Sequence, residues 1–114
     1  MSEAANERPF DVIVYGATGF TGQLVAAYLL REYGVDRDVR WAIAGRNMAK
    51  LEQVRDELGA DAAALEMLVA DSHDKDAVAA LAGQTRVVLS TVGPYALYGS
   101  DLVAACVEAG TDYC

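Results

Sequence analysis

The segment 11–22, with the sequence DVIVYGATGFTG, constrains the fold of this chain more than any other segment. It begins as a short apolar run rich in β-branched residues and stops at Gly16. Two more glycines follow at three-residue steps, Gly19 and Gly22, and an amphipathic segment begins at Gln23. A buried strand, a tight glycine turn and a helix N-terminus in this order are typical of a site for a dinucleotide pyrophosphate.

Apolar runs and amphipathic segments alternate along the rest of the chain, and each of the ten glycines is predicted at a boundary between them. Strands are expected at 12–15, 41–44, about 66–70 and 86–91, helices at 23–33, 48–58, before Gly83 and from about 100 to 109, and a fifth strand from 111. This alternation predicts an α/β fold: a Rossmann-like, doubly wound parallel sheet with strand order 3-2-1-4(-5), truncated after the fourth helix.

The length and composition of the chain allow one domain. The 114 residues are 54% apolar, which is enough for a single core, and no apolar run approaches the ~20 residues of a membrane span. We expect residues 1–9 to be a disordered polar lead and 10–114 to be the nucleotide-binding domain.

The net charge of −8 argues against nucleic acid or anionic lipid as partners. Without a signal peptide, the cytoplasm is the expected location, and the two cysteines have no metal-ligand spacing.

The glycine turn is the first predicted part of a cofactor site. Gly16 allows the sharp exit from the strand, Gly19 allows the backbone to approach the phosphates, and Gly22 allows close packing of the helix on the strand. The helix N-terminus then favours an anion. The alternative is a glycine-rich turn without a ligand. Three further residues of the turn are included in the predicted site: Thr18, Phe20 and Thr21.

Arg46 is the second part, because it follows the second predicted strand. An NAD site usually has an acidic residue there for the ribose 2′-hydroxyl, but this sequence reads Ala-Gly-Arg-Asn. Arg46 is suited to a 2′-phosphate, Lys50 adds charge one helical turn on, and Asn47 between them is included in the site. NADP(H) is therefore the predicted cofactor and NAD(H) the alternative. The alternative interpretation of Arg46 and Lys50 is a solvated pair at the start of a helix, without a ligand.

The third and fourth predicted strands add two more candidate regions. Asp71 follows the third strand and is placed to accept a hydrogen bond from the adenine amino group, or is an ordinary cap or turn residue. After the fourth strand, Gly93 and Pro94 are predicted to contact the nicotinamide ribose, together with Val92. Tyr95 either lines the nicotinamide pocket or packs on the following helix. No catalytic residue is identified.

Two families share this glycine turn. The extended short-chain dehydrogenases and the related epimerases need a Tyr-x-x-x-Lys pair, and neither lysine here, Lys50 or Lys75, lies four residues after a tyrosine. The segments 15–22 (YGATGFTG), 44–47 (AGRN), 91–95 (TVGPY) and 103–113 (VAACVEAGTDY) instead resemble the saccharopine dehydrogenase-like oxidoreductases. Within that group the chain is most similar to the mycobacterial trans-acting enoyl reductases, although Cys114 differs from the residue expected there.

The resemblance implies the N-terminal NADP-binding domain of a longer enzyme, which is inactive on its own. The whole enzyme would transfer a hydride from NADPH to a carbon–carbon double bond of an acyl chain held by a polyketide synthase, in lipid synthesis. The alternatives are a dehydrogenase- or epimerase-type domain and a non-catalytic module that senses NADPH. Truncation before a complete fifth strand also predicts self-association through the edge of the fourth strand.

Overall fold

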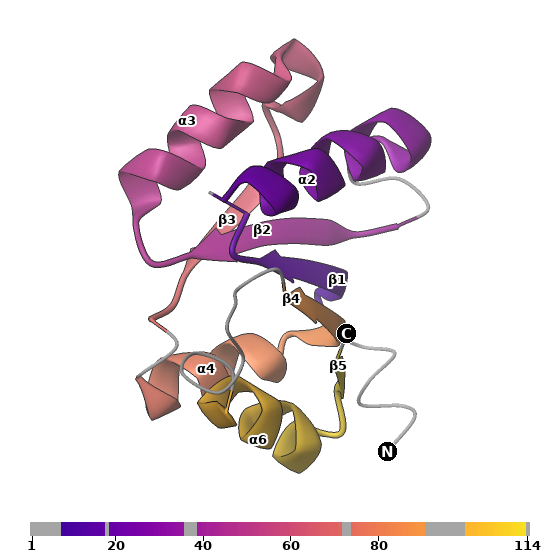
Figure 1. The fold of residues 1–114 in the computed structure, drawn as a ribbon. Coiled ribbons are helices and arrows are strands. Elements are labelled where there is room, and N and C mark those ends of the chain that lie inside the picture. Colours follow the sequence, from indigo (N-terminus) through magenta and orange to yellow (C-terminus); the bar gives the residue numbers. More distant parts are fainter. Residues whose placement is uncertain (1–7, 18, 36–38, 72–73, 91–99, 114) are drawn as a thin grey trace.

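The computed structural model describes residues 8–17, 19–35, 39–71, 74–90 and 100–113 (Figure 1). Strands and helices alternate through these residues, as predicted. The strands are β1 (Phe10–Tyr15), β2 (Trp41–Gly45), β3 (Glu66–Val69), β4 (Thr85–Ser90) and β5 (Asp112–Tyr113). The helices are α2 (Phe20–Tyr33), α3 (Met48–Leu58), the short 3₁₀ helix η1 (Ala60–Ala62), α4 (Lys75–Ala82) and α6 (Ser100–Ala109).

The strands form one parallel sheet in the order β3-β2-β1-β4-β5, which confirms the predicted topology. β1 lies in the middle, with β2 on one side and β4 on the other. The two-residue β5 pairs with Val87 and Val88, so the chain itself covers that part of the β4 edge. The predicted fifth strand is thus present and short, and self-association through the remainder of the β4 edge stays a prediction.

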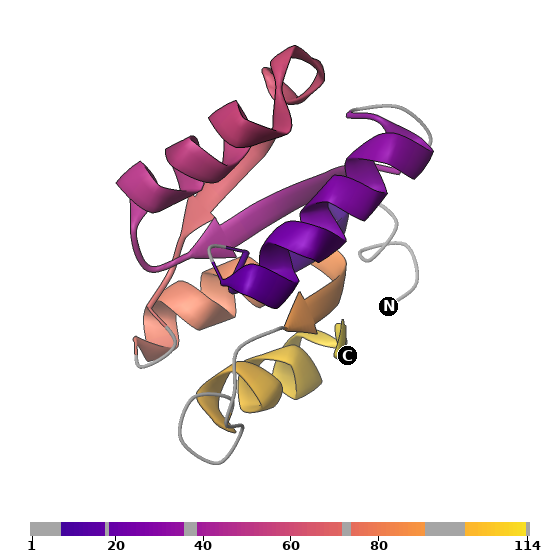
Figure 2. The ribbon, with the colours of Figure 1, turned by 45° about the horizontal axis from the view of Figure 1, so that its top comes forward.

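Helices cover both faces of the sheet, α2 and α3 one face and α4 and α6 the other (Figures 1 and 2). The side chains of β1 alternate between the two layers. Val14 joins the cluster under α2 and α3, whereas Ile13 and Tyr15 join the cluster with α4 and α6. Strands buried on both faces explain the continuous apolar runs in the sequence. Cys106 is buried in the α4 and α6 layer, which confirms its assignment to the core.

Side-chain caps fix where two helices begin. The Asn47 side-chain oxygen accepts from the Lys50 N–H at 3.2 Å, and the Asp74 carboxylate accepts from the Ala77 N–H at 3.1 Å. α2 begins at Phe20, three residues before the predicted start, so Gly22 lies inside a helix. The prediction that every glycine lies at a boundary was therefore wrong for Gly22, and the reason is steric, as the site shows below.

Arg8 joins the start of the described chain to its end. Its guanidinium donates to the Thr85 carbonyl at 2.7 Å, and to the Ala109 carbonyl and the Thr111 hydroxyl at 2.5 Å. The Thr111 hydroxyl donates in turn to the Ala82 carbonyl at 2.7 Å. A cation at the C-terminus of α6 also interacts favourably with the helix dipole. We refer to Arg8, Thr85, Ala109 and Thr111 as the Arg8 network.

The Cys106 thiol gives the fold a pH dependence. Burial raises the pKa of this thiol from 9.0 to about 11. In an unfolded chain the thiol ionises near pH 9, so between the two pKa values the unfolded state binds fewer protons than the folded state. Raising the pH through this range therefore lowers the free energy of unfolding. The contribution of Cys106 to stability is thus complete below pH 9 and is expected to be lost as the pH rises toward 11.

Urea unfolding across this pH range, on wild type and on Cys106→Ala, isolates the effect from other titrating groups. The free-energy difference between the two chains is expected to shrink at alkaline pH. Two profiles that stay parallel throughout the range would contradict a buried, protonated thiol.

Candidate dinucleotide site

The predicted site residues of the described chain come to one edge of the sheet. Because the strands are parallel, their carboxyl ends lie together, and we call this side the carboxyl edge. The glycine turn follows β1, Arg46 follows β2 and Asp71 follows β3. β4 ends at Ser90 on the same edge, next to Tyr15 of β1. Figure 1 shows the turns after β1 and β2 at this edge, where α2 and α3 begin.

The glycine turn is tight and is held by backbone hydrogen bonds. Gly16 has a φ of 88°, which favours glycine, and its N–H donates to the Ala44 carbonyl at 2.9 Å. The Gly19 N–H donates back to the Gly16 carbonyl at 3.1 Å, and α2 starts at the next residue. The cap residue of α2 is Gly19, which has no side chain to cap the helix, and the first turn contains no acidic residue. These features leave the positive end of the helix dipole to an external anion.

Gly19 and Gly22 are glycines for different reasons. A Cβ on Gly22 would lie 2.3 Å from the Gly16 carbonyl oxygen and 2.6 Å from the Ala17 Cα, so the packing of α2 on the turn excludes any side chain. Among the described residues, a Cβ on Gly19 would meet only the Gly16 oxygen, at 3.5 Å, which is an ordinary contact. The fold therefore requires glycine at 22 and has room for a side chain at 19. Phe20 and Thr21 are exposed in the first turn of α2, and Thr18 lies outside the described residues.

The residues after β2 present positive charge to solvent. Arg46, Asn47 and Lys50 are all exposed, directly after the buried Gly45. Within the described residues, the Arg46 guanidinium makes no ion pair. The Asn47 side-chain oxygen is used in the cap of α3. Lys50 lines a groove between α2 and α3, together with Gln23 of α2 and Gln53, Val54 and Glu57 of α3.

Asp71 is exposed at the corner where the chain leaves β3. The residue before it, Ala70, is buried and is held twice: its N–H donates to the Gly45 carbonyl at 2.9 Å, and its carbonyl accepts from the Tyr15 hydroxyl at 2.7 Å. Asp74 caps α4, so Asp71 is not the cap of that helix. It is a turn residue, whose carbonyl accepts from the Asp74 N–H. Residues 92–95, the predicted nicotinamide contacts, lie outside the described residues.

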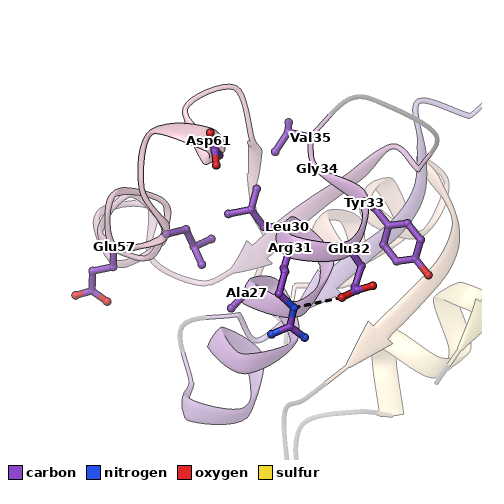
Figure 3. Close-up of a pocket in the computed structure, with 10 residues that line it drawn as sticks. Ala27, Leu30, Arg31, Glu32, Tyr33, Gly34, Val35, Glu57 and Asp61 are labelled. Carbon is purple, nitrogen blue, oxygen red and sulfur yellow. Dashed lines mark hydrogen bonds and ion pairs between the residues drawn. The ribbon is translucent and has the colours of Figure 1, made fainter.

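A cavity of about 800 Å³ lies at the opposite end of α2 (Figure 3). It is bounded by the C-terminal ends of α2 and α3, and its polar side chains include Glu32, Glu57 and Asp61. Arg31, the cation there, pairs with Glu32 at 3.2 Å. Helix C-termini and carboxylates repel a phosphate, and no predicted site residue lines this cavity. It is not the dinucleotide site.

No group of three or more His, Cys, Asp or Glu side chains is gathered as metal ligands would be, within the residues that the structure describes. None of the helices in that part of the chain is long and apolar enough to cross a membrane.

Comparison with known families decides between the two that share the glycine turn. Residues 12–114 match the family model described as the saccharopine dehydrogenase NADP binding domain. The chain belongs to this family. The predicted cofactor class, NADP(H), is confirmed by this membership, and the dehydrogenase- or epimerase-type alternative is set aside.

Relatives of the saccharopine dehydrogenase-like domain are found among longer mycobacterial proteins. A Mycobacterium tuberculosis protein whose name gives it as a candidate trans-acting enoyl reductase is 48% identical over 109 residues, which are 96% of this chain and 25% of that protein. A trans-acting enoyl reductase of Mycobacterium leprae is 45% identical over 108 residues, 95% of this chain and 25% of its own length. The chain thus spans about a quarter of the length of these relatives.

Solved structures show the same fold at low identity. Saccharopine dehydrogenase (L-Glu forming) from Saccharomyces cerevisiae superposes with a TM-score of 0.73 at 21% identity, over 91% of this chain and 21% of that enzyme. Triphenylmethane reductase from Citrobacter sp., complexed with NADP(H), has a TM-score of 0.68 at 20% identity, over 90% of this chain and 35% of that enzyme. Both confirm the Rossmann-like architecture.

Proposed function

We propose that the carboxyl edge of this sheet binds NADPH, with the pyrophosphate on the glycine turn and the 2′-phosphate on Arg46. The observation that carries the proposal is one juxtaposition. The N-terminus of α2, whose cap residue Gly19 has no side chain, follows β1, and the Arg46 guanidinium, which makes no ion pair within the described residues, follows the neighbouring strand β2. Both positive groups would therefore contact the same ligand.

The room at Gly19 supports the pyrophosphate position. The packing of the described residues does not require glycine there, so an approaching phosphate is the reason that we propose for it. The backbone N–H groups at the start of α2 would donate to the phosphate oxygens, which gives Phe20 and Thr21 a role through their backbone. Thr18 belongs to the same turn and is proposed as a further contact.

The charge at the start of α3 supports the 2′-phosphate position. The forked guanidinium of Arg46 suits two phosphate oxygens, and Lys50 adds a second positive charge from the α2–α3 groove. Asn47 would contribute through its backbone or its amide nitrogen, because its oxygen caps the helix. Asp71 is proposed for the adenine, and Val92, Gly93, Pro94 and Tyr95 for the nicotinamide half.

For the longer protein we propose NADPH-dependent reduction of an acyl carbon–carbon double bond, carried by a polyketide synthase in the cytoplasm. The names and the 45–48% identity of the mycobacterial relatives support this activity. Bound NADPH supplies the hydride, and the chain described here holds and orients it. The other candidate, a module that senses NADPH, shares the binding site and differs only in turnover.

NADPH oxidation by the full-length protein with an enoyl thioester tests the proposal. Oxidation is expected with the enoyl substrate and not with the saturated thioester of equal length, which is the matched control. The 114-residue chain alone should bind NADPH and oxidise none, because no catalytic residue is assigned in it. Binding by the full-length protein without oxidation, across many acyl acceptors, would overturn the reductase and favour the sensor.

A further inference from the structure

We infer that Tyr15 is a positioning residue for the adenosine end of the cofactor, acting through Asp71. This inference rests on the proposed function, since it concerns the same carboxyl edge. Tyr15 is not among the site residues predicted from the sequence. The signal in the sequence is a tyrosine in the last position of the predicted strand 12–15, whose other residues are Val and Ile.

The Tyr15 side chain connects two strands that do not pair with each other. It starts on β1, is 2% exposed, and shares its core cluster with Ala42, Ala44 and Ala70. β2 separates β1 from β3 in the sheet. Ala42 and Ala44 of β2 have small side chains, which leave space for the large Tyr15 ring in the same core cluster. The hydroxyl ends on the Ala70 carbonyl oxygen at 2.7 Å.

The hydrogen bond fixes the peptide that orients Asp71. Ala70 is the last residue held by the sheet, through its N–H on the Gly45 carbonyl, and the next residue is exposed. The Ala70 carbonyl belongs to the peptide that leads into Asp71, so holding this carbonyl sets the direction in which the Asp71 Cα leaves the sheet. Without the hydroxyl, a buried carbonyl would lose this partner and the corner would rearrange to recover one.

The same residue connects both halves of the proposed site. Tyr15 directly precedes Gly16, whose N–H is fixed on the Ala44 carbonyl at 2.9 Å. One residue therefore ends the strand that carries the phosphate turn and also fixes the corner proposed for adenine. A tyrosine that served only the core would have no effect on ligand affinity beyond its effect on stability, and this difference is measurable.

The test is calorimetric titration of 2′,5′-ADP, the adenosine half of NADPH, into wild type and Tyr15→Phe. The phenylalanine keeps the ring and removes the hydroxyl. We expect affinity to fall about fivefold, the effect of one hydrogen bond. Thr111→Val is the matched control, because it also removes a buried hydroxyl that donates to a carbonyl, that of Ala82, away from the carboxyl edge. It should leave the affinity unchanged.

A double-mutant cycle separates an effect of Tyr15 on the position of Asp71 from a general destabilisation of the fold. If Tyr15 acts through Asp71, Tyr15→Phe should change the affinity of an Asp71→Ala chain by less than about twofold. Equal loss in both backgrounds, unchanged affinity in Tyr15→Phe, or equal loss in Thr111→Val would each overturn the inference. Wild type that fails to bind 2′,5′-ADP would overturn the proposed function together with it.

A measurement on wild type covers the case in which Tyr15→Phe does not fold. Saturating 2′,5′-ADP should shift the NMR signals of the Ala70 carbonyl carbon and the Tyr15 ring, because both are mechanically joined to the adenosine contact. The Ala82 carbonyl, which is in the control position, should not shift. Unchanged Ala70 and Tyr15 signals at saturation would overturn the inference.

Discussion

Gly22→Ala is expected to destabilise the domain by about 3 kcal/mol, because a new Cβ would overlap backbone atoms that cannot move independently. The nearest is the Gly16 carbonyl oxygen at 2.3 Å, followed by the Ala17 Cα at 2.6 Å. Relief requires α2 to move away from β1, which also opens the core cluster that contains Val14 and Ala26. Urea unfolding followed by circular dichroism measures the effect as a lower midpoint.

Gly19→Ala is the matched control, three residues away in the same turn. Within the described part of the chain, its Cβ would make a single ordinary contact of 3.5 Å, so we expect a change in stability below about 1 kcal/mol. Its NADPH affinity should nevertheless fall, because the methyl group occupies the side from which we propose that the phosphate approaches. Equal unfolding midpoints for Gly22→Ala and Gly19→Ala would contradict the different roles given to these two glycines.

The second large effect is expected at Arg46. Arg46→Ala should weaken NADPH binding about tenfold to a hundredfold and leave NADH binding nearly unchanged, since charge-assisted hydrogen bonds to a 2′-phosphate are lost only with NADPH. Fluorescence titration with both nucleotides measures the two affinities. The ratio between them, rather than either affinity alone, reports on the 2′-phosphate.

Arg55→Ala controls for the change in net charge. Arg55 lies in the last turn of the same helix, away from the carboxyl edge, and pairs with Asp56 at 3.4 Å. Its removal should leave the NADPH to NADH ratio as in wild type. The assignment of Arg46 fails if wild type binds NADH as tightly as NADPH and Arg46→Ala leaves both affinities unchanged.

The topology could be predicted from the sequence because its determinants are local. A strand that ends in glycine and is followed by an amphipathic helix can be recognised from about a dozen adjacent residues. Repetition of this unit predicts the order of the strands in the sheet. Arg46 could be identified in the same way, from its place after a strand. Prediction failed for Gly22, because the atoms that exclude its side chain become visible only once α2 is packed on the turn.

Individual side-chain contacts between residues distant in the sequence could not be predicted. The Tyr15 hydroxyl finds its acceptor 55 residues later, and Arg8 finds two of its acceptors 101 and 103 residues later. No periodicity or spacing connects such positions in a single sequence. A polar residue before a strand and a tyrosine at its end are compatible with many partners, so their roles depend on the completed fold.

The Arg8 network also has a consequence for synthesis of the protein. The ribosome makes Arg8 before its acceptors at Thr85, Ala109 and Thr111, which follow 77 to 103 residues later. β1, which belongs in the middle of the sheet, likewise waits for β4. During translation this apolar strand is therefore incompletely covered, and the nascent chain offers a binding segment to chaperones until nearly the whole domain has left the ribosome.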